Sequence, residues 1–173
     1  MPPGVQRYLV LEQGVGSGVL NLLINAAIAW VMFRGATTVP MWGEQSIGAD
    51  TIGTTFFLPF LTCLIGTRIV RAQVRSGRVP AFADVPTLVV RLPRGTAARG
   101  AMLGALSVAV VGVPAAIALS GLGVTEMRFW PFVGFKAIFA ALLATVVTPV
   151  IALYALASPS PHQSVDTPAG PPP

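Results

Sequence analysis

The chain has 173 residues, enough for one ordinary domain, but its composition excludes an ordinary soluble one. Apolar residues make up 54% of the sequence and charged residues only 10%, whereas soluble domains carry roughly 25% charged residues to cover a water-facing surface. Much of the surface must therefore face lipid. The single cysteine, Cys63, excludes an internal disulfide and a multi-cysteine metal site, and the single histidine, His162, has no other plausible ligand near it. We expect neither a metal nor a cofactor.

Four apolar segments are long enough to cross the hydrocarbon core of a bilayer, since about 20 helical residues suffice. In chain order they lie at about 12–33, 52–70, 100–122 and 131–157. The first is too long for the apolar core of a signal peptide and no A-x-A site follows it, so we expect it to be retained. No run alternates as a strand would. The sequence predicts an all-α polytopic membrane domain in residues 1–158, with four transmembrane helices in two hairpins. A Pro-rich tail, 159–173, is expected to be disordered and cytoplasmic.

Arginine is concentrated on one side of this predicted topology. The connection 71–99 and the end of the second span carry seven arginines against one acid, Asp84. Loops rich in Lys and Arg stay in the cytoplasm. The pattern therefore predicts a cytoplasmic loop at 71–99, both termini on the same side, and a bacterial inner-membrane location.

Four of these arginines share one face of a helix. Arg68, Arg71, Arg75 and Arg78 follow one another at spacings of three, four and three residues. We interpret them as contacts to anionic lipid headgroups, each worth about 1 kcal/mol, or to a partner protein. Nucleic acid is not expected as a partner, because no aromatic residues are interleaved with the arginines and no binding-fold signature is present.

Polar side chains form a stripe along the first span. Ser17, Asn21 and Asn25 recur every four residues, and Glu12 lies near the inner end of the same helix. One interpretation is that they hydrogen-bond neighbouring helices, each bond contributing about 0.6 kcal/mol. The other is that they form the polar wall of a solute path. The sequence leaves both open.

Lys136 is the only ionisable residue well inside the fourth span. Its ammonium can reach the interface along its flexible stem, or it can form a buried ion pair with an acid on the outer side. The candidate partners are Glu44, Asp50 and Glu126. We also consider the hypothesis that Lys136 and one of these acids recognise an anionic ligand.

Three prolines interrupt the predicted spans and small residues line them. Pro59, Pro114 and Pro149 each remove a helical hydrogen bond, which predicts kinks in the second, third and fourth spans. Glycine and alanine recur at four-residue spacing in the first, third and fourth spans. Such ridges allow close packing, either within a four-helix bundle or between copies of the chain.

No residue pattern predicts an enzyme, since the chain lacks a Walker loop, a G-x-S-x-G turn and a paired-carboxylate motif. Two functions are consistent with the sequence. The first is a small permease-like or channel-like protein that acts as an oligomer. The second is a non-transporting membrane subunit that scaffolds, regulates or assembles with another membrane protein through the basic loop.

Overall fold

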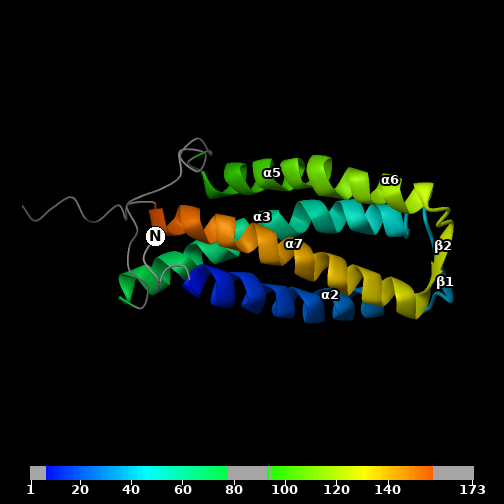
Figure 1. Cartoon of the computed structure of the whole chain (residues 1–173), viewed down its shortest axis with the longest axis horizontal. Coiled ribbons are helices and arrows are strands. Elements are labelled where there is room, and N and C mark those ends of the chain that lie inside the picture. Colours follow the sequence, from blue (N-terminus) through cyan, green and yellow to red (C-terminus); the bar gives the residue numbers. More distant parts are fainter. Residues whose placement is uncertain (1–6, 78–92, 94, 158–173) are drawn as a thin grey trace, which may run out of the picture.

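The computed structural model describes residues 7–77, 93 and 95–157. In these ranges it is mostly helical, and four helices are long and apolar enough to cross a membrane. The first consists of a π-helical turn, η1 (Tyr8–Gly16), continued by α2 (Ser17–Phe33). The second is α3 (Ile47–Arg75), and the fourth is α7 (Phe129–Ala157). The third consists of α5 (Thr96–Ser107), the π-helical η2 (Val108–Gly112) and α6 (Val113–Gly121). All four run along the long axis of the molecule (Figure 1), which confirms the prediction of a mostly helical chain that fits a membrane protein.

The second helix is longer at both ends than the predicted span 52–70. It begins five residues earlier because Ser46, in extended conformation, accepts a hydrogen bond from the Ala49 N–H with its hydroxyl at 3.2 Å and so caps the first turn. At the other end it continues through Arg75, and Gly77 follows shortly after its last residue. Gly77 has φ +71°, and its N–H donates to the Val74 carbonyl at 3.1 Å. The predicted arginine face therefore extends beyond the apolar part of the helix, although Arg78 lies outside the described residues.

The loops at the opposite end of the bundle pair as a small sheet, although no strand was predicted there. Strand β1 (Thr38–Pro40) runs antiparallel to β2 (Glu126–Arg128), with Val39 opposite Met127. Strands of three residues are too short to show the alternation by which strands are recognised in a sequence. The sheet ties the loop between the first two helices to the loop between the last two (Figure 1).

The helices pack in an order that differs from the expected two hairpins. Helix α7 lies in the middle and packs against η1–α2 on one side and α3 on the other, while the third helix packs on α3. Within the described residues, the members of each expected hairpin therefore make their main contacts with other helices. Because α7 packs between them, α2 and α3 are held apart, and a groove opens between them.

Small residues account for the close contacts within this bundle. A Cβ atom on Gly18 would overlap the Thr145 hydroxyl of α7, and one on Gly104 would lie 2.7 Å from the Phe56 carbonyl of α3. In α7, Ala140 and Ala144 are fully buried. The glycine ridges of the first and third helices thus serve packing inside one chain, the first of the two alternatives left open by the sequence.

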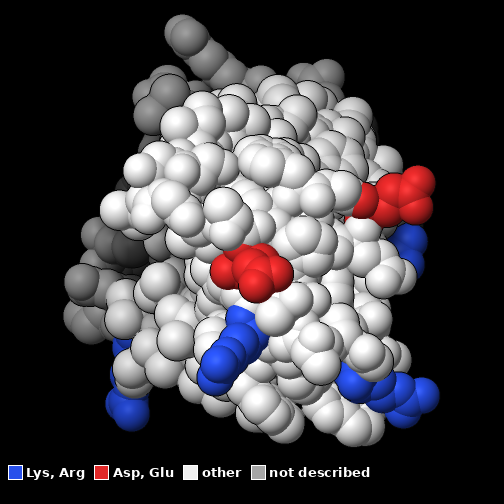
Figure 2. All heavy atoms as spheres, turned by 90° about the vertical axis from the view of Figure 1, so that its right-hand side faces the viewer, with Lys and Arg blue, Asp and Glu red and all other residues white. Residues whose placement is uncertain are grey.

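Apolar packing also holds the end of the molecule that carries the sheet. Phe33 of α2 meets Phe132 of α7 edge-to-face, with ring centroids 4.7 Å apart, and Ile47 and Val39 are buried beside them. Seen from this end, charged side chains are few on a largely uncharged surface, and acidic side chains lie next to basic ones (Figure 2). Three exposed tryptophans, Trp30, Trp42 and Trp130, also belong to this end.

The three prolines in the predicted spans do not end the helices that contain them. Pro59 lies inside α3 and Pro149 inside α7. Pro114 follows directly after the first residue of α6, and the π-helical η2 ends two residues before it. A π-helical turn is an ordinary local adjustment where proline removes a backbone donor. The predicted tail 159–173, and most of the loop 71–99, lie outside the described residues.

Candidate functional site

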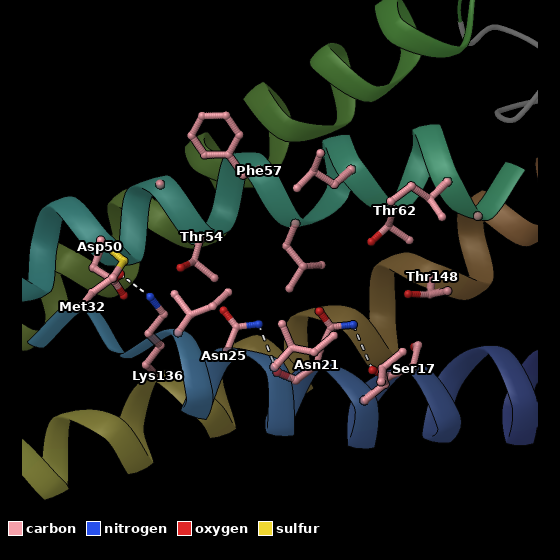
Figure 3. A pocket seen from close by; sticks show the side chains of 18 of the residues that line it. Ser17, Asn21, Asn25, Met32, Asp50, Thr54, Phe57, Thr62, Lys136 and Thr148 are labelled. Atoms are coloured by element: carbon pink, nitrogen blue, oxygen red, sulfur yellow. Dashed lines mark hydrogen bonds and ion pairs between the residues drawn. The ribbon is translucent and has the colours of Figure 1, made fainter. Parts of the chain in front are cut away.

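The gap between α2 and α3 forms a groove of about 760 Å³. One wall is helix η1–α2, the other is α3, and the floor includes side chains of α7 (Figure 3). The groove runs between two ends of the bundle: the end at Glu12 and Val70, which the sequence predicts to be cytoplasmic and which is called the inner end here, and the opposite end at Glu44 and Asp50, called the outer end. Its length thus matches most of the apolar part of the two helices that form its walls.

The polar stripe predicted in the first span lines this groove (Figure 3). The Asn21 amide donates to the Ser17 carbonyl at 2.9 Å, and the Asn25 amide donates to the Asn21 carbonyl at 3.0 Å. A backbone carbonyl can only accept, so each amide nitrogen must face its own helix. The two amide oxygens are then left as acceptors, and no hydrogen bond to them is found among the described residues.

Of the two interpretations of the stripe, interhelical hydrogen bonding therefore applies only to Ser17. Its hydroxyl contacts the Ala144 carbonyl of α7 at 3.3 Å and also donates to carbonyls of its own helix. In the part of the chain that the structure describes, Asn21 and Asn25 form no hydrogen bond to another helix, although Asn25 is 92% buried by neighbouring atoms and so is held firmly in place. The two asparagine side chains instead form part of the wall of the groove.

Hydroxyl groups face the stripe from the other two sides of the groove. Thr54 and Thr62 come from α3, and Thr148 comes from α7 (Figure 3). Thr148 is only 6% exposed, and its hydroxyl has no hydrogen-bond partner among the described residues. A buried polar group without a partner costs about 1–3 kcal/mol, so a solute that hydrogen-bonds Thr148 would recover this cost.

An ion pair between α3 and α7 lies near the outer end of the groove. The Lys136 ammonium donates to the Asp50 carboxylate, and the two side chains are 4% and 10% exposed. Lys136 therefore forms the ion pair rather than extending to the interface, with Asp50 as its partner. Glu44 lines the same end of the groove but forms no ion pair within the described residues, and Glu126 lies on β2, away from the groove.

Polar groups also join the two walls at the inner end. The Tyr8 hydroxyl donates to the Gln73 side-chain oxygen of α3, and the Gln13 amide donates to the Tyr8 hydroxyl at 2.8 Å. Gln13 and Glu12 line the groove just beyond this contact. Neither Tyr8 nor Gln73 was expected from the sequence, because their contact depends on how far α3 crosses toward the first helix.

The edges of the groove are apolar, in contrast to its interior. On α2 the exposed residues Leu20, Ile24 and Ile28 border it, and on α3 Phe57, Leu61 and Ile65 do so. The groove therefore presents hydrocarbon-like edges around a line of amides, hydroxyls and one ion pair. This combination suits a molecule that has both an apolar body and polar groups.

A second polar cluster, missed at the level of sequence, surrounds Arg99 of α5. This arginine was counted among the loop charges, but its side chain is fully buried. Its guanidinium carbon lies 3.7 Å from the centre of the Tyr154 ring of α7, and it donates to Cys63 at 3.4 Å and Thr67 at 3.3 Å, both on α3. Arg99 thus clamps three helices together at the inner end. Arg68 and Arg75, by contrast, are exposed.

The groups in the groove are suited to binding a molecule. The described residues contain no group of three His, Cys, Asp or Glu side chains close enough to hold a metal ion. The groove offers acceptors, hydroxyls and a neutralised ion pair, which are groups that bind and orient a molecule. No protein-family model, curated protein or solved structure matches this chain.

Proposed function

We propose that this protein is a small permease-like membrane protein that takes an amphiphilic solute into the groove between α2 and α3. The observation that carries the proposal is the groove itself, which extends along both helices with a polar interior and apolar edges. Burying amides in hydrocarbon without interhelical bonds is unfavourable. Asn21 and Asn25 have this unfavourable placement, which a transported solute would explain and a purely structural helix would not.

The two ends of the groove have the properties of gates. Polar side-chain contacts lie at each end, Tyr8 with Gln73 at the inner end and Lys136 with Asp50 at the outer end. Contacts of this kind can break and re-form, whereas a packed apolar plug resists opening. The groove is open along one side, so a single copy does not enclose a path, and we propose that the protein acts as an oligomer.

The proposal includes an orientation in the bacterial inner membrane, with both termini in the cytoplasm. Exposed Arg68 and Arg75 at the end of α3 support it, because such residues contact anionic headgroups on the cytoplasmic face. The exposed tryptophans at the opposite end fit the outer interface.

A bulky residue in the groove should abolish transport without disturbing the fold. Gly53 of α3 lines the groove, and a Cβ atom there would meet nothing within 4 Å. We expect Gly53→Phe to fill the groove and lower flux at least about tenfold, because solute and phenyl ring would compete for the same space. The measurement is flux in proteoliposomes of three fluorescent amphiphiles: ethidium (cationic), N-phenyl-1-naphthylamine (neutral) and 1-anilinonaphthalene-8-sulfonate (anionic).

The matched control is Gly134→Phe in α7, where a Cβ atom also meets nothing within 4 Å but which lies outside the groove. It should transport like the unmodified protein. Absence of protein-dependent flux for all three probes would contradict the proposal.

The alternative function is a non-transporting subunit that assembles with another membrane protein through its basic loop. It would be supported if replacing Arg68, Arg71 and Arg75 with glutamine abolished the pull-down of a partner protein.

A further inference from the structure

We propose that the groove selects organic cations, a deepening that rests on the proposed function. The chain as a whole is basic, with eleven Lys and Arg against six Asp and Glu. The described residues that line the groove have the opposite balance: Glu12, Glu44 and Asp50 against Lys136 alone. The lining thus carries a net charge of −2 inside a protein of net charge +5.

The arrangement of these charges matters as much as their number. Lys136 is committed to Asp50, so its ammonium is neutralised and poorly placed to hold a second anion. This is the opposite of the anionic-ligand hypothesis drawn from the sequence. The two remaining carboxylates, Glu12 and Glu44, lie at opposite ends of the groove and have no ion-pair partner within the described residues. A positive charge entering from either end therefore meets a carboxylate first.

The interior between the two ends also favours a cation. The amide nitrogens of Asn21 and Asn25 are used by their own helix, which leaves their oxygens with their partial negative charge toward the groove. The buried Thr148 hydroxyl, without a partner among the described residues, offers a further oxygen from the floor. Independently of the carboxylates, this is a line of acceptors for an N–H donor or a diffuse positive charge.

The apolar edges of the groove indicate what the uncharged part of the solute is like. Leu20 and Ile24 on one side, with Phe57 and Leu61 on the other, would contact an apolar body. The solute class is thus a cation whose charge is attached to or surrounded by hydrocarbon. A small hydrated inorganic cation would not use these edges.

Two probe ions of equal size and opposite charge test this inference, tetraphenylphosphonium and tetraphenylborate. Binding of each ion to the full-length protein in a neutral maltoside detergent is measured by flow dialysis. The amount of ion bound by the Gly53→Phe variant is subtracted as non-specific binding. We expect tetraphenylphosphonium to bind at least about tenfold more tightly than tetraphenylborate. Glu12→Gln and Glu44→Gln should each weaken it about threefold, a modest change because both carboxylates are exposed. Glu126→Gln, an exposed acid on β2 outside the groove, should leave binding unchanged.

The outcomes separate the two proposals. If tetraphenylborate binds equally well or better, and loses this binding in Gly53→Phe, the groove holds solutes but cation selection is wrong. Cation selection is also wrong if both glutamine variants retain full affinity for tetraphenylphosphonium. If neither ion shows binding that Gly53→Phe removes, the inference and the proposed function both fail.

Discussion

Replacing Lys136 with methionine is expected to lower the free energy of unfolding by about 3 kcal/mol, because it leaves the Asp50 carboxylate unpaired in a largely buried site. Methionine has a similar length and fits the apolar surroundings. The loss in free energy of unfolding therefore reports the loss of the charge rather than a change in packing. The measurement is unfolding by titration with sodium dodecyl sulfate in mixed micelles, followed by circular dichroism.

The double variant Lys136→Met with Asp50→Asn supplies the control. Removing both charges replaces an ion pair with neutral groups, so most of the lost stability should return. A Lys136→Met protein as stable as the unmodified one would show that Asp50 is not held in a buried pair. A double variant less stable than either single variant would lead to the same conclusion.

Replacing Gly104 with leucine is expected to separate the third helix from α3, at a cost of about 3 kcal/mol. The first side-chain carbon alone would lie 2.7 Å from the Phe56 backbone carbonyl and 3.0 Å from its ring. Backbone cannot move aside as a flexible side chain can, so the two helices must move apart. The same detergent unfolding titration measures the change.

Gly134→Leu is the matched control, since a Cβ atom there meets nothing within 4 Å. Leucine is also a better helix former than glycine, by about 0.8 kcal/mol. We therefore expect this variant to be as stable as the unmodified protein or slightly more so. Equal destabilisation by both substitutions would mean that α5 does not pack on α3 through Gly104.

The helices could be predicted because each one is determined by a continuous stretch of its own sequence. Runs of about 20 apolar residues can satisfy their backbone in lipid only as helices, and Gly77 marks the end of α3 by its own conformation. The packing order could not be predicted. It depends on contacts between residues that are far apart in the sequence, such as Val39 and Met127, which lie 88 positions apart in two short loops that carry no strand pattern.

The candidate site was predicted in part. The four-residue spacing of Ser17, Asn21 and Asn25 identified one wall, because side chains at that spacing share a helix face. The partner of Lys136 could only be narrowed to the acids on one side, and the choice of Asp50 follows from the distance between α3 and α7. Arg99 could not be recognised as buried, because its neighbours Cys63 and Tyr154 come from two other helices.

A polar groove that opens within a bundle surrounded by lipid should admit water, whereas the lipid-facing surface should not. Cysteine reactivity in membranes tests it most directly, in a Cys63→Ser background with Thr62→Cys or Val146→Cys. Thr62 lines the groove, whereas Val146 is exposed on α7 outside it. A charged, water-soluble methanethiosulfonate reagent modifies a thiol only where water reaches it. We predict rapid modification at position 62 and none at position 146. Modification of both would contradict a surrounding bilayer, and modification of neither would contradict a groove that admits polar molecules.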